Sequence, residues 1–517
     1  MTRILPIGPR AFLVELADLD ATLALFDALA ADPVAGVSEI VPAARTLMVT
    51  TDPGVPADAA LARAVLARQP APGTAPAPRR AETVEIPVTY DGEDLAEVAT
   101  LMGLTTDEVI AAHQAATWQV AFCGFAPGFA YMTCADARFD LPRRPAPRTR
   151  IPAGSVALAG RFCGIYPQAS PGGWQLIGRT EVPMFDLTRD VPALLRPGVR
   201  ARFVTGSARV HAVALPEPAP VTGLRVVQTA FPILVQDAGR MGQAGQGVSA
   251  SGALDLGALR RANRAVGNPA GEAALEITLG PVRLRAEVAM TLALTGAATA
   301  RVGAQAQPAA FALDAGDEVT IDPPARGMRS YLAIRGGFDV APVLNSCATD
   351  TLAQIGPAPL MAGDALAPAG RAAGAVTDPG PGPDLPQAGA VVTLPVTLGP
   401  RTDWFDDATV QRFLAQEWSV TPQSSRVGIR LSGEALTRED ARELPSEGTA
   451  TGAIQVPHSG QPVLFLADHP LTGGYPVIAT LHPAALDLAG QLPPGTRIRF
   501  AADAPFADID PEASDVS

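Results

Sequence analysis

Apolar and polar positions along the chain predict many short strands and a few helices. Helical spacing of apolar residues recurs in four segments, at 20–30, 58–69, 107–116 and 255–266. Thr105 and Glu108 form a capping-box pattern at the start of the third segment. Short β-type runs separated by Gly and Pro dominate elsewhere, for example at 11–16, 46–50, 155–159, 175–178, 463–466 and 497–500. The pattern favours a β-rich α+β protein that contains barrels or sandwiches.

Parts of the sequence resemble each other at positions about 300 residues apart. Ser-Pro-Gly-Gly-Trp-Gln-Leu-Ile at 170–177 is echoed by Leu-Thr-Gly-Gly-Tyr-Pro-Val-Ile at 471–478. The segment 195–203 is echoed by 492–500, and 154–156 by 452–454, in the same order along the chain. We therefore expect two related β domains that pack as a pseudo-symmetric pair, with the cleft between them as the default ligand site.

Stretches rich in Pro, Gly and Ala divide the chain at 70–80, 215–223 and 356–389. The units predicted from this punctuation are a small α+β domain at 1–80, a barrel at 81–215, an intermediate region at 224–355 and a second barrel at 390–505. The tail after residue 502 is acidic, and we expect it to fray.

Composition excludes several classes of function. All 39 basic residues are arginine, so the chain supplies no Schiff-base lysine, P-loop lysine or biotinylated lysine. The net charge of −13 repels polyanions, which makes nucleic acid an unfavourable partner. No apolar run approaches the ~18 residues of a membrane-spanning helix, and Pro6 interrupts any signal-peptide core, so we expect a cytoplasmic protein. Four cysteines without a C-x-x-C pair are expected to be buried thiols.

His113 is the candidate acid–base residue. It lies in the last turn of the capped helix, where the helix C-terminus stabilises an imidazolium by about 0.3–1 kcal/mol. The alternative is a surface or half-buried helix histidine without a chemical role. The other histidines lack metal-ligand spacing.

Arginines and glycines are the candidate binding residues. Arg143 and Arg148 lie on a Pro-rich stretch before Ser155, and rigid guanidinium groups can hold a carboxylate or phosphate; a solvated basic loop is the alternative. The paired glycines before Trp174 and Tyr475 either let the backbone approach a ligand or are only hairpin glycines. The candidate binding residues are Arg143, Arg148, Ser155, Gly172, Gly173, Arg240, Gln455, Thr472, Gly473, Gly474 and Tyr475. The candidate carboxylates for Mg²⁺ or proton transfer are Asp237, Glu447 and Asp468.

Together these motifs resemble the families of the B and C subunits of 5-oxoprolinase, also called allophanate hydrolase subunits 1 and 2. The B-type motifs are Gly-Phe-Ala-Pro-Gly-Phe-Ala-Tyr at 124–131, Arg-Ile-Pro-Ala-Gly-Ser-Val at 150–156 and the segment at 165–180. The C-type motifs are Gln-Asp-Ala-Gly-Arg at 236–240 and the segments at 247–255, 425–431 and 472–476. The chain resembles a fusion of two normally separate subunits, which also form the carboxyltransferase region of urea carboxylase.

The resemblance implies cyclophilin-like β-barrels and one of two activities. In the first, the B and C subunits use ATP to phosphorylate 5-oxoproline, and the separate A subunit of 5-oxoprolinase opens the ring to glutamate. In the second, the chain transfers a carboxyl group from carboxybiotin to urea. The biotin must be attached to another protein, because this chain cannot carry biotin itself. A regulatory protein that inhibits a kinase is a third alternative. A homo-oligomer is compatible with each of these.

Overall fold

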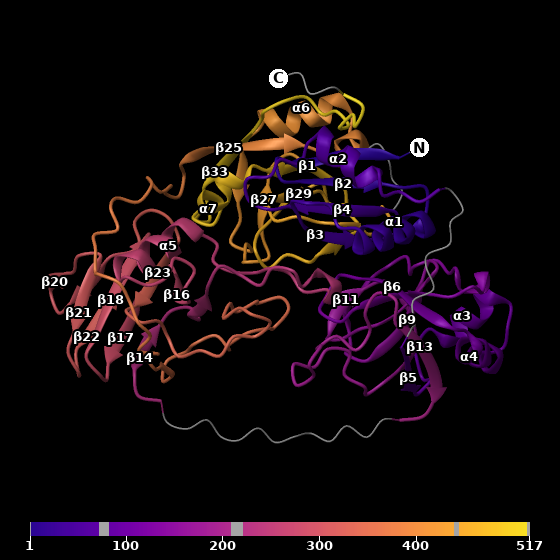
Figure 1. Cartoon of the computed structure of the whole chain (residues 1–517), viewed down its shortest axis with the longest axis horizontal. Coiled ribbons are helices and arrows are strands. Elements are labelled where there is room, and N and C mark those ends of the chain that lie inside the picture. The colour runs from indigo at the N-terminus through magenta and orange to yellow at the C-terminus, as the bar shows by residue number, and fades with distance from the viewer. Residues whose placement is uncertain (1, 72–81, 208–220, 439–443, 514–517) are drawn as a thin grey trace.

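The computed structural model describes residues 2–71, 82–207, 221–438 and 444–513. Figure 1 shows an N-terminal domain beside a C-terminal barrel at the top, with two further β-rich units below them. Each of these four parts has a hydrophobic core of its own. The predicted boundaries near residues 80 and 215 lie outside the described residues.

The N-terminal domain is a four-stranded antiparallel sheet with two helices, in the strand order β1-β2-β4-β3. Asp18 and Asp58 cap the helices by accepting hydrogen bonds from the backbone N–H groups of Ala21 and Leu61. The elements are β1 (Arg3–Gly8), β2 (Ala11–Glu15), α1 (Leu19–Ala31), β3 (Val37–Pro42), β4 (Thr46–Thr51) and α2 (Ala59–Leu66). Both helices predicted in this segment are confirmed.

The first barrel is a seven-stranded sheet in the order β12-β9-β10-β7-β6-β13-β5, and an isolated bridge between Thr89 and Arg179 joins its two ends. Its seven strands are β5 (Thr83–Val88), β6 (Trp118–Cys123), β7 (Ala130–Thr133), β9 (Ser155–Ala159), β10 (Phe162–Ile165), β12 (Gln175–Arg179) and β13 (Arg200–Thr205). A separate two-stranded sheet consists of β8 (Arg148–Ile151) and β11 (Ser170–Gly172). The helices are α3 (Leu95–Met102), α4 (Thr106–Ala115) and the 3₁₀ turn η1 (Ala137–Phe139). The predicted capping box of Thr105 and Glu108 is present at the start of α4.

The middle unit consists of two sheets around one hydrophobic core, and helix α5 covers the outer face of the second sheet. The strands are β14 (Leu224–Thr229), β15 (Leu234–Gln236), β16 (Ala274–Thr278), β17 (Val282–Ala286), β18 (Met290–Gly296), β19 (Ala300–Val302), β20 (Gln305–Ala306), β21 (Ala310–Leu313), β22 (Glu318–Ile321), β23 (Arg329–Ile334) and β24 (Ala365–Leu366). The helices are η2 (Ala244–Gln246) and α5 (Leu256–Ala265).

The C-terminal barrel is closed, in the order β25-β32-β29-β30-β27-β26-β33. Its strands are β25 (Val391–Leu398), β26 (Trp418–Val420), β27 (Gly428–Ser432), β29 (Ala453–Gln455), β30 (Val463–Phe465), β32 (Val477–Leu481) and β33 (Arg497–Ala502). A separate two-stranded sheet consists of β28 (Glu447–Gly448) and β31 (Thr472–Gly473). Its helices are η3 (Thr402–Trp404), α6 (Asp407–Ala415), η4 (Pro483–Ala485) and α7 (Leu486–Ala489).

The two barrels repeat one topology, which confirms the duplication expected from the sequence. Within the described residues each barrel uses its strands in the same order, and in each the first strand pairs in parallel with the last. The equivalence extends to side chains. The indole N–H of Trp118 donates to the His113 carbonyl at 3.1 Å, and that of Trp418 donates to the Phe413 carbonyl at 3.0 Å. The name cyclophilin-like for these barrels stays a prediction.

The N-terminal domain packs on the C-terminal barrel, far from it in sequence (Figure 1). Residues of the C-terminal tail hold the two parts together, because Asp508 pairs with Arg3 at 2.8 Å and the Ile509 N–H donates to the Ile4 carbonyl. The expectation of a frayed tail is therefore wrong for residues 503–513.

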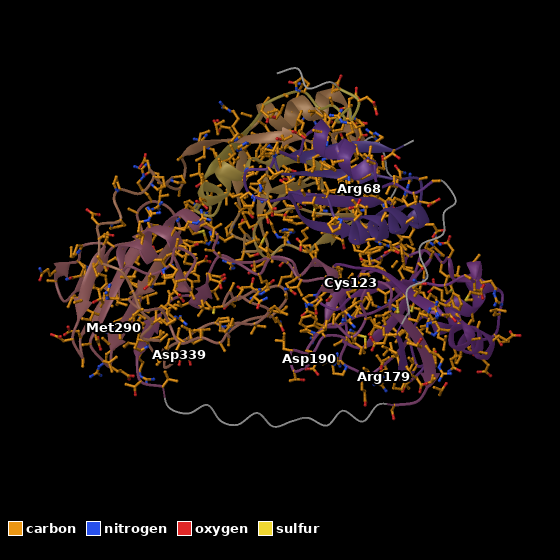
Figure 2. The ribbon with its side chains drawn as sticks, in the orientation of Figure 1. Arg68, Cys123, Arg179, Asp190, Met290 and Asp339 are labelled. Atoms are coloured by element: carbon orange, nitrogen blue, oxygen red, sulfur yellow. The ribbon has the colours of Figure 1, made fainter. Side chains whose placement is uncertain are left out.

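Labelled side chains mark the two lower units in Figure 2. Figure 2 shows Arg179 and Asp190 on the first barrel, and Met290 and Asp339 on the middle unit. Among the described residues, no helix combines the length and apolarity needed to cross a bilayer.

Candidate functional site

The paired glycines belong to two equivalent β-ribbons, β8–β11 and β28–β31. Gly172 lies opposite Arg148, and Gly473 lies opposite Glu447. A Cβ atom on Gly172 would collide with the hydroxyl of Tyr166, and one on Gly473 would lie 2.6 Å from the amide nitrogen of Gln455. Glycine at these two positions thus lets each ribbon pack closely against a side chain of its own barrel.

Loops of three domains meet beside the second ribbon. The Phe125 N–H donates to the Thr472 hydroxyl at 3.0 Å, and the Gly128 N–H donates to the Gln246 carbonyl at 2.8 Å. The Thr351 N–H donates to the Asp468 carboxylate at 2.9 Å. This region combines the B-type and C-type motifs of the sequence. We call it the three-domain junction, formed by residues 124–128, 246–251, 350–352 and 468–472.

Asp468 is the best-connected carboxylate of the junction. It is fully buried and forms a two-point ion pair with Arg426, with both N–O distances at 3.0 Å. The hydroxyls of Ser251 and Thr351 also donate to it, each at 2.7 Å. Burial opposes ionisation of Asp468, but the Arg426 charge and these hydrogen bonds outweigh burial and lower the pKa of the carboxyl.

Asp350 is a second buried acid of the junction. Its carboxylate accepts hydrogen bonds from the Ser249 hydroxyl and from the Leu352 and Ala353 N–H groups. Burial first, and the negative charge of Asp468 second, raise the pKa of Asp350 to about 6. The junction therefore holds one carboxyl whose pKa is lowered and one whose pKa is raised to about 6.

Arg240 lies beside these acids and is 1% exposed. One of its nitrogens, Nη2, donates to the Ala348 carbonyl, whereas Nε and Nη1 have no hydrogen-bond partner among the described residues. Burial lowers its pKa, although the charges of Asp350, Asp237 and Asp468 act in the opposite direction. A buried guanidinium with unused N–H groups is suited to an anion, and the anion-binding role of Arg240 stays a prediction.

Asp237 organises the loop that faces Arg240. Its carboxylate accepts from the Ser346 hydroxyl and the Cys347 N–H, both at 2.6 Å, and from the Gly239 N–H at 2.8 Å. These bonds occupy both carboxylate oxygens.

Tyr131 and Arg143 lie at the boundary between the first barrel and the second ribbon. Burial raises the pKa of Tyr131, and the Ser446 hydroxyl, the Arg143 charge and the Thr472 hydroxyl act against that rise. The Arg143 side chain is exposed, and its charge also reaches Tyr166. Phenol, hydroxyl and guanidinium groups from both halves of the chain thus come together around Tyr131.

Two predicted residues are held in ion pairs within the chain. Arg148 forms a two-point pair with Asp94, with N–O distances of 3.0 and 2.8 Å. Glu447 pairs with Arg401 and is 6% exposed. The expectation that Arg148 faces an open anion site is not met, because internal carboxylates already bind its N–H groups.

His113 lies in the core of the first barrel. Its ring contacts the Tyr90 hydroxyl at 2.9 Å and the Cys163 sulfur at 3.5 Å, and it is 0% exposed. Burial lowers its pKa to about 3, so the expected imidazolium is wrong: burial outweighs the helix C-terminus. The structurally equivalent residue of the second barrel is Phe413, which indicates a packing position.

The remaining predicted residues have local roles. The Ser155 hydroxyl donates to the Pro152 carbonyl at 2.8 Å and shapes the turn before β9. The Gln455 amide donates to the Tyr475 carbonyl at 3.1 Å. The Tyr475 ring is 38% exposed and lies edge-on to His458, whereas the equivalent Trp174 is buried. Gly173 and Gly474 follow the two ribbons directly.

The predicted carboxylates do not fit a Mg²⁺ site. No group of three or more His, Cys, Asp or Glu residues within the described ranges could hold a metal ion. Asp468, Glu447 and Asp237 are engaged by arginines, hydroxyls and backbone N–H groups, which leaves too few free oxygen ligands for magnesium. No step is therefore assigned to this ion.

Two family models match the chain. "Carboxyltransferase domain, subdomain C and D" matches residues 2–195, and "Carboxyltransferase domain, subdomain A and B" matches residues 246–502. The chain belongs to the carboxyltransferase-domain family. This carboxyltransferase-domain protein contains both subdomain pairs in one chain.

The curated relatives each match part of the chain. The carboxyltransferase-domain protein is 40% identical to the C subunit of 5-oxoprolinase from Escherichia coli (strain K12) over 283 residues, or 54% of this chain and 90% of the relative. It is 48% identical to the B subunit of 5-oxoprolinase from Escherichia coli O157:H7 over 124 residues, or 23% of this chain and 57% of the relative. Urea amidolyase of Lachancea kluyveri is 32% identical over 296 residues, which span 52% of this chain and 16% of that relative.

Solved structures extend the likeness to the whole fold. The crystal structure of TTHA0988 superposes with a TM-score of 0.83 at 35% identity and covers 95% of this chain and 99% of its own. The Kluyveromyces lactis urea carboxylase gives a TM-score of 0.50 at 28% identity, covering 54% of this chain and 27% of its own. The arrangement of the carboxyltransferase-domain protein is thus close to that of a solved chain of the same extent.

Several residues that organise the junction and the ribbons were not foreseen from the sequence. Asp350, Asp94 and Arg401 stand in no motif, and only contacts between segments distant in sequence identify them. Arg426 and Tyr131 stand inside quoted motifs, which was the available signal.

Proposed function

We propose that this chain is the fused B and C component of an ATP-dependent 5-oxoprolinase. In this reaction the γ-phosphoryl group of ATP moves to the lactam oxygen of 5-oxoproline and ADP leaves. The separate A subunit then opens the activated ring with water, which gives glutamate and releases the transferred phosphoryl group as inorganic phosphate. The higher identity to 5-oxoprolinase subunits than to urea amidolyase supports this choice.

The observation that carries the proposal is that groups of both halves meet at one junction. The Phe125 N–H of the B-like half donates to Thr472 of the C-like half. Tyr131 of the first half is influenced both by the Arg143 charge and by the Thr472 hydroxyl. A small substrate with one carboxylate and one amide suits such a mixture of guanidinium, hydroxyl and backbone N–H groups.

Arg143 and Arg240 are the proposed anion-binding residues. Two nitrogens of Arg240 have no partners among the described residues, and a phosphoryl or carboxylate oxygen would complete their hydrogen bonding. Arg143 is exposed beside the Tyr131 and Tyr166 phenols, where it would hold the carboxylate of the incoming substrate. Arg148 is left out because Asp94 neutralises it.

The test is release of ADP from ATP by the purified chain, with and without 5-oxoproline and with and without a purified A subunit. The proposal expects 5-oxoproline to stimulate ADP release, and Arg240→Met to lower turnover by about a hundredfold. Arg143→Met should act mainly by raising KM. Absence of any stimulation by 5-oxoproline in the presence of the A subunit would overturn the proposal.

Carboxyl transfer to urea is the second candidate, favoured by the likeness to urea amidolyase and urea carboxylase. The same protein would be mixed with urea and a carboxylated biotin carrier supplied in trans. Formation of carboxylated urea without ATP-dependent consumption of 5-oxoproline would select this function.

A further inference from the structure

The two ribbons are each held by a buried ion pair, and the pairs occupy equivalent positions with opposite charge. Arg148 lies opposite Gly172, and Glu447 lies opposite the equivalent Gly473. The residue opposite this glycine is thus a base in the first ribbon and an acid in the second.

The partners of these residues are equivalent as well. The Asp94 N–H donates to the Leu176 carbonyl at 3.0 Å, and the Arg401 N–H donates to the Val477 carbonyl at 2.9 Å. Leu176 and Val477 correspond in the sequence repeat. Asp94 and Arg401 therefore occupy one structural position in the two barrels, again with opposite charge.

Each central residue is shared by two residues of the opposite sign. Asp94 accepts from both Arg148 and Arg144 in the first barrel. Arg401 donates to both Glu447 and Glu15 in the second barrel, and Glu15 belongs to the N-terminal domain. Asp94, Arg401 and Glu447 are buried, and Arg148 retains 18% exposure of its side chain. Glu15 of the N-terminal domain is thus the second partner of Arg401, as Arg144 is the second partner of Asp94 in the first barrel.

We propose that the ion pairs Asp94–Arg148 and Arg401–Glu447, which have reversed polarity, position the two ribbons and restrict each ribbon to its own barrel. A ribbon docked on the wrong barrel would bring Arg148 against Arg401, or Glu447 against Asp94. Two like charges at a buried site are strongly unfavourable, so the reversal discriminates between two otherwise related folds. Because Glu15 also pairs with Arg401, the Arg401–Glu447 pair links the N-terminal domain to the ribbon that carries Thr472.

The test is hydrogen exchange of the ribbon amides in peptides spanning 446–450 and 470–475, measured by mass spectrometry on the full chain. Glu447→Arg places two arginines together and should speed exchange there by more than about a hundredfold. The triple variant Glu447→Arg, Arg401→Glu, Glu15→Gln restores an opposite-charge pair with reversed polarity and should return exchange to within about fivefold of wild type. Neither result depends on which reaction the protein catalyses.

Two controls keep the test decisive. Arg497→Gln removes an exposed pair with Glu417 in the same barrel and should leave ribbon exchange unchanged. Peptides spanning 155–165 report whether the first barrel remains folded in each variant. If Glu447→Arg unfolds the whole chain, the milder Glu447→Gln should still speed ribbon exchange by about tenfold. Wild-type protection in Glu447→Arg, or no recovery in a folded triple variant, would overturn the proposal.

Discussion

Arg426 is the side chain whose loss should do most damage at the contact between the C-terminal barrel and the middle unit. It is 6% exposed and pairs with Asp468 in its own barrel and with Glu276 in the middle unit, the latter at 2.6 Å. It also donates to the Gly252 carbonyl at 2.6 Å. Arg426→Met keeps much of the side-chain volume and removes the charge and every one of these bonds.

The expected cost follows from the two carboxylates that remain buried. Removing one partner of a buried ion pair costs about 3–5 kcal/mol. The low end applies here, because Asp468 keeps the hydroxyl bonds of Ser251 and Thr351, and Glu276 keeps the Tyr331 hydroxyl at 2.7 Å. A loss of about 3 kcal/mol corresponds to a fall in Tm of roughly 6–12 °C for a cooperative unit of about 150–250 residues.

The loss should depend on pH in a defined direction. In the wild type the pKa of Asp468 is lowered, so its contribution to stability is present above the unfolded pKa and is lost as pH falls through the folded value. Without Arg426, burial dominates and the carboxyl is easier to protonate. The difference in Tm between wild type and variant should therefore be largest at pH 7 and shrink towards about pH 4.

Calorimetry of both proteins between about pH 4 and pH 7 measures this difference. Arg497→Met is the matched control, because its pair with Glu417 is exposed and should change Tm by less than about 2 °C. A Tm for Arg426→Met within about 2 °C of wild type at pH 7, or a difference that grows on acidification, would refute the reasoning.

Two further predictions concern single buried groups. Asp350→Asn should flatten the dependence of the unfolding free energy on pH. The folded pKa of Asp350 is raised to about 6, so its protonated form stabilises the wild type below the unfolded pKa, and about 3 kcal/mol is lost as pH rises through 6. Urea titrations at several pH values should find this loss in the wild type and not in the variant. His113→Phe places at this position the residue found at the equivalent position of the second barrel, Phe413. Turnover should change by less than about threefold, because the His113 ring is a packing element. A loss above about a hundredfold in steady-state assays would support an acid–base role instead.

The internal sequence repeat allowed the duplicated barrels to be predicted, and local chemistry allowed several elements to be predicted. The capping box at Thr105 could be predicted because residues that are neighbours in the sequence determine where a helix starts. The glycine pairs could be noticed because glycine marks positions of close backbone packing. The same logic failed for His113, where a favourable position at a helix end was outweighed by burial in the barrel. Burial results from tertiary packing, which a single sequence does not display.

Ion pairs between distant segments were the least predictable part. Arg148 looked like an anion clamp because its partner Asp94 is 54 residues away. Glu447 looked like a catalytic acid because its partner Arg401 lies in another segment of the chain, and Glu15, which shares Arg401, is further away still. The surplus positive charge that marks an anion site can be judged only after such partners are known. Within the part of the chain that the structure describes, the Nε and Nη1 groups of Arg240 have no such partner.

The most direct test of the proposed function is the ratio of two products. The chain, the purified A subunit, ATP and 5-oxoproline are incubated together, and glutamate and ADP are measured in the same samples. The account predicts one glutamate for each ADP, with neither formed above background when the chain is omitted. ADP release that is independent of 5-oxoproline, with no glutamate above background, would contradict it.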